Sequence, residues 1–366
     1  MKISDIITST TVLTVLLLFS CASVRKTDSA DFPAIKAQGY YTAGGTVRTN
    51  PGTFDPGNVY TSTAGQTVHG DHASYFYQIP VNSRKLPMVF LHGITQSGKC
   101  WSTTVDGRDG FHNIFLKDGY SVYLVDQPRR GQAGQSTEDA SVPSDAADQM
   151  HFDMFRIGLW PQFYTGVQFP QDKESVNQLF RQMTPNIGPY NNNLITDGLS
   201  AVFDQTGPAI FFTHSAGGII GWKAAMKNDN VRAIVAIEPG MFVFPEGKIP
   251  EISKNTFTEV TGVATTPETV SEEEFKKLAR IPIIIYFGDN IPSKPTKVPG
   301  EDFWRMTLET AYEFAKAVNS YGGNVTVVHL PDEGIYGNTH FIMSDLNNKV
   351  IADHISSWLK KNSLDK

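Results

Sequence analysis

The chain has few cysteines and no excess of basic residues, and both shortages narrow the classes of protein to which it can belong. Only two cysteines, Cys21 and Cys100, occur among its 366 residues. A small domain held together by a network of disulfides is therefore excluded. Lysine and arginine number 31 against 37 aspartates and glutamates, which gives a net charge of −6. Because nucleic-acid binding needs a broad basic surface, we expect no nucleic-acid partner.

Long hydrophobic runs are also scarce, and the one at the N-terminus is short. Residues 11–19 are apolar apart from Thr11 and Thr14, and Lys2 precedes them. Such a run is too short to span a bilayer but has the length of the apolar region of a signal peptide. It ends in Leu18-Phe19-Ser20-Cys21, which resembles a bacterial lipobox. We predict a signal peptide over residues 1–20 and attachment to a membrane through a lipidated Cys21.

The predicted export has consequences for location and for the cysteines. We expect a lipoprotein of the outer membrane or cell surface, or otherwise a periplasmic or secreted protein. Cleavage before Cys21 would leave Cys100 as the sole unmodified thiol, so no disulfide could form within the mature chain. Residues 21–38 are small and polar, which predicts a tether.

From residue 39 to residue 366 the hydrophobic pattern predicts one α/β domain. Its first β-rich segments are expected to be antiparallel edge strands, at residues 39–47, 65–68 and 73–79. Short runs that are apolar on both faces follow and are typical of buried parallel strands, at residues 87–91, 120–125, 209–212, 231–237, 281–287 and 324–330. Helical patterns lie at residues 218–227, 271–280, 302–320 and 346–360. We therefore predict a doubly wound, mostly parallel sheet with antiparallel N-terminal strands.

One connection is too long for a simple crossover. About 80 residues separate the strand that ends at Asp126 from the strand that starts near Ala209, which exceeds the usual connection length. We predict an inserted lid over about residues 135–200. Aromatic residues gather at its centre, and Trp160, Phe163 and Tyr164 are predicted to line a pocket for an apolar substrate group. Packing of the lid on itself is the alternative for each of them.

The stretch Thr213-His-Ser-Ala-Gly217 differs at one position from the nucleophile elbow G-x-S-x-G, because Thr213 replaces the first glycine. A predicted strand leads into it and a predicted helix follows, which is the context of a catalytic serine. We predict Ser215 as the nucleophile. The pair His92-Gly93 follows another strand, where such a pair opens the oxyanion loop of α/β-hydrolases. The backbone N–H groups of Ile94 and Ala216 are the predicted oxyanion donors.

A nucleophilic serine needs a base, and the base needs an acid. His340, in Gly337-Asn-Thr-His-Phe341, follows the last predicted strand and is the predicted base. Glu238 and Asp289 are both candidate acids, because each follows a strand at the carboxyl edge of the sheet. Their positions do not separate them. The run His69-Gly-Asp-His72 lacks further ligands, so we predict no metal site.

A set of short motifs resembles a small group of secreted bacterial esterases within the α/β-hydrolase superfamily. These motifs are HGI with W at 92–101, DGRDGF at 106–111, VDQPRRG at 125–131, THSAGG at 213–218, IEPG at 237–240, FGD at 287–289 and GNTHFIM with D and NN at 337–348. In that group the triad acid is a glutamate in an E-P-G turn after the sixth strand. The resemblance therefore implies a Ser215, His340 and Glu238 triad, with Asp289 as a structural carboxylate near the His340 loop.

The resemblance implies a serine esterase that forms an acyl-enzyme, needs no cofactor and acts on a small-molecule ester. A lactonase, amidase or acyltransferase is the alternative with the same triad, because the triad does not select the acceptor. A non-catalytic binding lipoprotein of the same fold is the alternative from another class. The presence of a serine, a histidine and an acid favours an enzyme. Nothing in the pattern indicates an oligomeric state.

Overall fold

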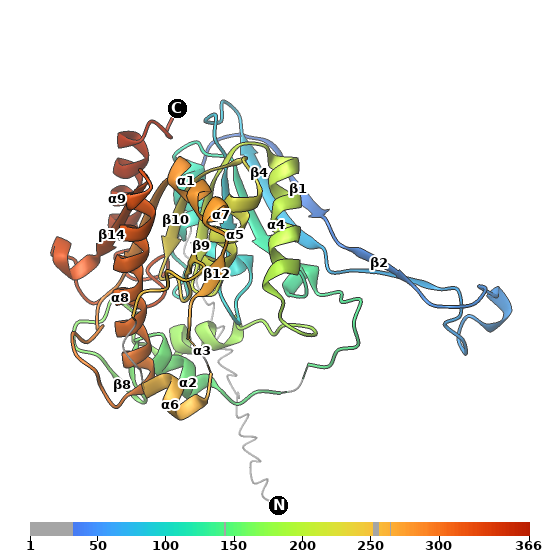
Figure 1. Ribbon diagram of the computed structural model, residues 1–366, viewed down its shortest axis with the longest axis horizontal. Coiled ribbons are helices and arrows are strands. Elements are labelled where there is room, and N and C mark those ends of the chain that lie inside the picture. The colour runs from blue at the N-terminus through green and yellow to red at the C-terminus, as the bar shows by residue number, and fades with distance from the viewer. Residues whose placement is uncertain (1–31, 143, 252–255, 264) are drawn as a thin grey trace, which may run out of the picture.

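The computed structural model describes residues 32–142, 144–251, 256–263 and 265–366 (Figure 1). The predicted signal peptide, Cys21 and residues 21–31 of the predicted tether lie outside these ranges. Strand β1 (Ile35–Ala43) pairs with β4 (Ala73–Pro80), so residues 35–38 belong to the sheet and not to a tether. Within the described ranges, no helix combines the length and the hydrophobicity of a membrane-spanning segment.

An eight-stranded sheet forms the centre, in the order β1-β4-β6-β5-β9-β10-β13-β14. Its other strands are β5 (Met88–Leu91), β6 (Val122–Asp126), β9 (Ala209–His214), β10 (Val231–Ile237), β13 (Pro282–Phe287) and β14 (Asn324–His329). The pairs β1/β4 and β4/β6 are antiparallel, and every other neighbouring pair in this sheet is parallel. The predicted mostly parallel sheet with antiparallel N-terminal strands is confirmed.

Alternate side chains of the central strands enter two separate cores. In β5, Met88 and Phe90 pack on the side of α1 (Phe111–Lys117) and α9 (Asn348–Lys361). Val89 and Leu91 pack on the side of α4 (Asn192–Thr206), α5 (Gly217–Lys227) and α8 (Pro299–Ser320). Because helices cover both faces of the sheet, its strands are apolar on both faces.

The remaining elements are short. The helical ones are α6 (Thr256–Thr261), α7 (Glu272–Lys277) and the 3-10 turns η2 (Pro56–Asn58), η3 (Gly98–Trp101), η4 (Gly131–Ala133), η5 (Leu278–Arg280) and η6 (Leu330–Glu333). A further pair of strands joins β11 (Val243–Pro245) to β12 (Glu268–Val270).

A cap is inserted between β6 and α4. It contains α2 (Asp148–Met154), the hairpin of β7 (Gly158–Leu159) and β8 (Gln162–Phe163), and α3 (Lys173–Arg181). Helix α4 packs on β1, β4 and α5 and leads directly into β9, so it is the crossover helix of the sheet. The described elements of the cap therefore run from α2 to α3, and α4, which begins at Asn192, lies outside the cap although the lid was expected to reach about residue 200.

Strands β2 (Thr46–Thr49) and β3 (Thr67–Gly70) pair only with each other among the described strands and project from the body as a narrow ribbon (Figure 1). The expected N-terminal strands are thus divided between two sheets. β1 and β4 extend the main sheet, whereas β2 and β3 form this ribbon.

Candidate active site

Ser215 lies in the turn between β9 and α5. Its φ is +54°, a left-handed conformation that costs energy in any residue with a Cβ. The backbone N–H of Ser215 donates to the Ile237 carbonyl at 3.0 Å, and its carbonyl accepts from the N–H groups of Gly218 at 2.9 Å and Gly240 at 3.0 Å. The bonds with Ile237 and Gly240 tie the turn to β10 and to the segment after it, and the bond with Gly218 ties it to α5, so the strained backbone is held in place.

Thr213 stands where the elbow motif has its first glycine, and Gly221 of α5 provides the space that it needs. Thr213 is completely buried. A Cβ at position 221 would lie 2.9 Å from Thr213 Cγ2, closer than such contacts normally come. The helix therefore carries its glycine opposite the threonine, and strand and helix still approach closely.

The loop after β5 packs directly against this turn. A Cβ on Gly93 would lie 2.6 Å from Ser215 Cβ, and a Cβ on Gly217 would lie 2.8 Å from the His92 carbonyl oxygen. Within the described chain, the backbone N–H groups of Ile94 and Ala216 donate to no other residue, as expected of oxyanion donors before a substrate binds. Ala216 thus follows Ser215 directly in the sequence, and Ile94 follows the glycine that packs against Ser215.

Two buried side chains hold this loop. His92 donates from Nδ1 to the Gly93 carbonyl at 2.8 Å and accepts at Nε2 from the Gln127 N–H at 3.2 Å. Burial lowers the pKa of His92 to about 4, so the ring is neutral at pH 7. Arg130 Nη1 also donates to the Gly93 carbonyl, at 3.1 Å. Both residues fix the loop and neither is placed as a base.

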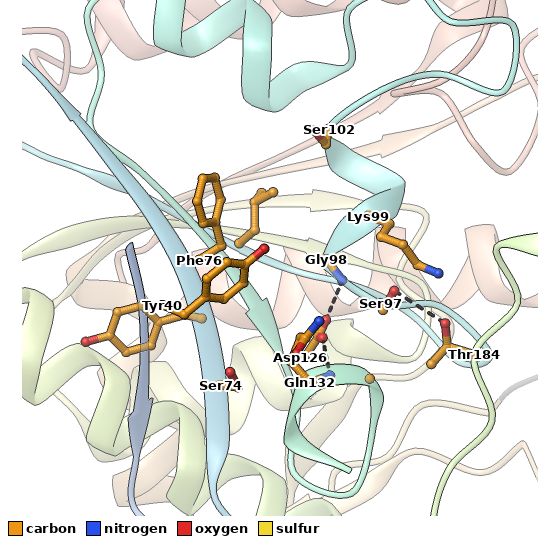
Figure 2. A pocket seen from close by; sticks show the side chains of 13 residues that line it. Tyr40, Ser74, Phe76, Ser97, Gly98, Lys99, Ser102, Asp126, Gln132 and Thr184 are labelled. Carbon is orange, nitrogen blue, oxygen red and sulfur yellow. Dashed lines mark hydrogen bonds between the residues drawn. The ribbon is translucent and has the colours of Figure 1, made fainter. Parts of the chain in front are cut away.

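A cavity of about 320 Å³ lies beside the segment that continues this loop, and Figure 2 shows the side chains that line it. Asp126 lies in its wall and accepts from the N–H groups of Gly98 at 2.6 Å and Gln132 at 2.7 Å. Tyr40 and Phe76 supply aromatic walls. None of the candidate triad residues lines this cavity, so its wall supports the loop and is separate from the candidate site.

His340 and Glu238 meet in the interior. His340 Nδ1 lies 3.1 Å from Glu238 Oε2, and both side chains are buried. Because Nδ1 must carry the hydrogen when it faces a carboxylate, Nε2 is left as the basic nitrogen. The rings of Trp304, His214 and Phe155 surround the imidazole, with centroid distances of 4.4, 4.4 and 5.4 Å.

No hydrogen bond joins the Ser215 hydroxyl to His340 among the described residues. Bonds of this kind are often long in a ligand-free enzyme and tighten in the substrate complex. The backbone of His340 is nevertheless fixed, because its N–H donates to the Phe155 carbonyl at 2.9 Å and its carbonyl accepts from His214 Nε2 at 2.9 Å.

Glu238 has a second partner, Arg156, which sequence analysis missed. Arg156 Nη2 donates to Glu238 Oε1 at 2.5 Å, and so does the Gly288 N–H at 2.5 Å. Burial opposes ionisation of Glu238, but Arg156 and His340 together lower its pKa to about 2. Burial lowers the pKa of His340, although Glu238 acts in the opposite direction. The pair is therefore a carboxylate and a neutral imidazole at pH 7.

The signal for Arg156 was present in the sequence. It is the sole charged residue in the aromatic stretch of residues 154–170. A lone charge in an apolar stretch is expected to have a buried partner. That partner, Glu238, is 82 positions away along the chain, and the pattern alone could not identify it.

Asp289, the other candidate acid, faces the loop that carries His340. Its Oδ2 accepts from the Gly337 N–H at 2.7 Å and its Oδ1 from the Asn290 N–H at 2.6 Å. The Asp289 N–H donates to the Asn338 carbonyl at 2.8 Å. Its carboxylate thus holds the loop, whereas the Glu238 carboxylate contacts the imidazole.

Asp345 is a second carboxylate that holds this loop. Its Oδ2 accepts from the Thr339 N–H at 2.8 Å and from Asn338 Nδ2 at 3.0 Å, and its Oδ1 accepts from Thr339 Oγ1 at 2.8 Å. All of these donors are buried. The residues immediately before His340 are therefore fixed from two directions.

The three cap aromatics predicted to line a substrate pocket contact other cap residues and Glu301. Trp160 is 44% exposed, and its ring contacts the Phe152 ring edge-on. The Phe163 ring also contacts the Phe152 ring edge-on. The Tyr164 hydroxyl donates to Glu301 Oε1 at 2.6 Å. Among the described residues, none of the three has a ring contact or hydrogen bond with Ser215 or His340. Phe155 is the cap aromatic that reaches the imidazole, and the pocket role of the three remains a prediction.

The run from His69 to His72 is held by structural contacts. The Asp71 carboxylate pairs with Arg129 Nε at 2.6 Å and accepts a hydrogen bond from Thr137. In the part of the chain that the structure describes, no group of three or more histidine, cysteine, aspartate or glutamate side chains could hold a metal ion.

Comparisons with known proteins identify the family to which this fold belongs. Residues 88–332 match the model of the "Alpha/beta hydrolase family". The chain is 29% identical over 318 residues to a protein named "Probable secreted lipase phiG" from Fungal sp. (strain ATCC 74256), covering 77% of this chain and 84% of that protein. A solved structure described as a novel bacterial esterase is 27% identical, with a TM-score of 0.70, and the match covers 90% of this chain and 97% of the other.

Proposed function

The chain belongs to the alpha/beta hydrolase family and is a carboxylic ester hydrolase, and from that premise we propose that Ser215, His340 and Glu238 are its catalytic triad. Ser215 attacks the ester carbonyl while His340 Nε2 takes the hydroxyl proton. The same proton then leaves with the alcohol. Water cleaves the acyl-enzyme by the corresponding steps, and Glu238 orients the imidazole and stabilises its protonated form.

The observation that carries this proposal is the 3.1 Å contact between His340 Nδ1 and Glu238 Oε2. It gives the base a fixed tautomer and a buried anion. The Ile94 and Ala216 N–H groups are proposed to bind the oxyanion, where loss of one donor typically costs about 3 to 4 kcal/mol of transition-state stabilisation.

We also propose that the protein is exported. The relative named as a secreted lipase supports export, and the lipobox-like sequence ending at Cys21 favours attachment to a membrane through a lipid.

Labelling with a fluorophosphonate tests the nucleophile. We expect a stable adduct on the wild type and none on Ser215→Ala, because the probe reacts with an activated serine. Intact-mass measurement would detect one adduct per chain. An unlabelled wild-type protein with esterase activity, or an undiminished adduct on Ser215→Ala, would refute the assignment of Ser215.

A pair of isosteric substitutions tests the acid. We expect Glu238→Gln to lower kcat on the order of 10³-fold or more, because the imidazolium loses its buried anion. Asp289→Asn should lower kcat far less, since the Asp289 carboxylate holds backbone N–H groups. Circular dichroism and urea unfolding serve as the folding controls. A folded Asp289→Asn protein that is the more impaired of the two would show that the acid is wrongly assigned.

A further inference from the structure

We infer that Arg156 of the cap is a positioning residue for catalysis, which fixes the Glu238 carboxylate against His340 and makes the geometry of the triad depend on the cap. This inference rests on the proposed triad and adds a residue that contacts the acid without touching the substrate.

The two carboxylate oxygens of Glu238 have different hydrogen-bond partners. Oε1 accepts from Arg156 Nη2 and from the Gly288 N–H, both at 2.5 Å, whereas Oε2 faces His340 Nδ1 at 3.1 Å. Because Oε1 is held by two donors from different segments, rotation of the carboxylate is prevented. Oε2 is therefore presented to the imidazole.

The same guanidinium reaches the loop that carries the base. Arg156 Nε donates to the Asp289 carbonyl at 2.9 Å, and the Asp289 carboxylate in turn holds the Gly337 N–H at 2.7 Å. Arginine suits this task because its planar fork of donors can hold two acceptors in fixed directions. A single ammonium group could not reproduce both contacts with the same geometry.

Arg156 is itself held rigidly by the cap and by α8. Its φ is +54°, and its N–H donates to the Asp153 carbonyl at 3.0 Å. Its guanidinium carbon lies 5.1 Å from the centroid of the Trp304 ring, whose Nε1 donates to the Met154 carbonyl at 2.6 Å. The Trp304 ring also contacts His340, at a centroid distance of 4.4 Å. One indole thus packs against both the guanidinium and the base.

Arg156 also contributes the nearest positive charge. The other titratable groups around the pair are His214 on the elbow, Asp289 and Asp345 on the loops beside His340, and Tyr164 and Glu301, which bond each other near the guanidinium. The charge of Arg156 lowers the pKa of Glu238 and also that of His340. Its removal should therefore let the pair bind a proton at higher pH.

The sign of the pH effect follows from the role of the pair. Ester hydrolysis needs neutral His340 and ionised Glu238, so activity falls when the pair takes up a proton as the pH decreases. In Arg156→Gln, which keeps an N–H donor but loses the charge, we expect kcat at least tenfold below wild type. The acidic limb of the kcat/KM profile should also move to higher pH by about one unit or more.

Two further variants distinguish the effect of the Arg156 charge from the effect of its donor geometry and from a general loss of stability. Arg156→Lys keeps the charge but not the fork, so its acidic limb should stay near that of the wild type while its kcat falls. Arg129→Gln is the matched control, because Arg129 is also buried and paired with a buried carboxylate, Asp71, at 2.6 Å. It should lose stability in urea without any shift of the acidic limb.

Several outcomes would overturn the inference. One is a folded Arg156→Gln protein with wild-type kcat and pH profile, and another is lower activity at every pH with no shift of the limb. If the glutamine variant does not fold, Arg156→Lys decides, and an unchanged kcat in that variant contradicts the role of the fork. Labelling of wild-type Ser215 separates the two proposals: an active, labelled wild type with insensitive Arg156 variants refutes this inference alone.

Discussion

Ser215, Glu238 and Arg156 have φ angles of +54°, +50° and +54°. A left-handed conformation costs roughly 1 to 3 kcal/mol in a residue with a side chain, and it persists where surrounding contacts determine it. Each of the three has such contacts. The backbone N–H groups of Ser215 and Glu238 donate to the carbonyls of Ile237 and Tyr286 at 3.0 and 2.8 Å. The proposed nucleophile, acid and positioning residue are thus all fixed by backbone hydrogen bonds.

The contact between Thr213 and Gly221 gives a prediction at the scale of single residues. Gly221→Ala should destabilise the protein by roughly 1 to 3 kcal/mol through overpacking, because its Cβ would lie 2.9 Å from Thr213 Cγ2. This is the opposite of the usual gain when alanine replaces glycine within a helix. Urea unfolding measures the change.

Adding Thr213→Ala to Gly221→Ala should restore most of the lost stability, because the Cγ2 atom that causes the clash is removed. The single Thr213→Ala variant is the control for the loss of the threonine itself. Equal effects of Gly221→Ala in the two backgrounds would mean that the two positions are not coupled.

The sequence supported the candidate nucleophile and base more strongly than the acid. Ser215 and His340 lie in motifs whose neighbours along the chain define their role. Glu238 and Asp289 both follow strands that end at the same edge of the sheet, and β10 and β13 are neighbours. What distinguishes the two carboxylates is the direction of each side chain and its distant partners, Arg156 and Gly337. The spacing of nearby residues in the sequence encodes neither the direction of the side chain nor its distant partner.

At the scale of elements, hydrogen bonds to the half-buried Asp289 and the buried Asp345 carboxylates hold the loop before His340. Asp345→Ala would leave the Thr339 N–H, the Thr339 hydroxyl and Asn338 Nδ2 without one of their acceptors. A buried donor without a partner costs about 1 to 3 kcal/mol, so we expect a loss of several kcal/mol together with slower fluorophosphonate labelling of Ser215. Urea unfolding and the labelling rate measure the two effects.

Asp353→Ala is the matched control for that substitution. Asp353 is 61% exposed on α9 and pairs with Lys349, and exposed pairs of this kind contribute roughly 0.3 to 0.5 kcal/mol. Equal losses of stability in the two variants, or normal labelling in a destabilised Asp345→Ala protein, would contradict the role of Asp345.

The elements themselves were predictable to different degrees. The buried strands were found because short, nearly continuous apolar runs between turn residues are typical of strands covered on both faces, as β5 and β10 show. The boundary between the cap and α4 was misplaced, because an amphipathic crossover helix and a lid helix have the same local pattern. Only its packing on β1, β4 and α5 identifies α4 as part of the sheet domain.

At the scale of the whole molecule, hydrogen bonds connect the cap to the loops that carry the proposed catalytic residues. The cap donates from the Thr184 N–H to the Thr95 carbonyl at 2.7 Å, and from the Gln168 N–H to the Gly337 carbonyl at 2.7 Å. Together with Arg156, these bonds join the cap to the proposed oxyanion loop, to the loop that carries His340 and to Glu238.

The β2–β3 ribbon contrasts with the cap, because its outer part contacts mainly itself. The Asn50 N–H donates to the Gln66 carbonyl at 2.9 Å, the Gly65 N–H donates to the Asn50 carbonyl at 3.2 Å, and Tyr60 is 98% exposed. The base of the ribbon is different, since a Cβ on Gly70 would lie 2.8 Å from the Ser136 backbone. The tip is thus independent of the core, whereas the base is packed against it.

Replacing residues 51–65 by a two-residue Asn-Gly turn should therefore leave the enzyme intact. Asn50 and Gln66 are already paired, so a tight hairpin turn can join them. We expect kcat/KM within about twofold and an unchanged unfolding midpoint, because surface changes away from core contacts usually alter stability by no more than about 0.5 kcal/mol. Gly70→Val, at the packed base, should instead lower the midpoint clearly. If the shortened chain loses activity, or if its apparent mass in gel filtration changes, the ribbon contacts another part of the chain or another molecule.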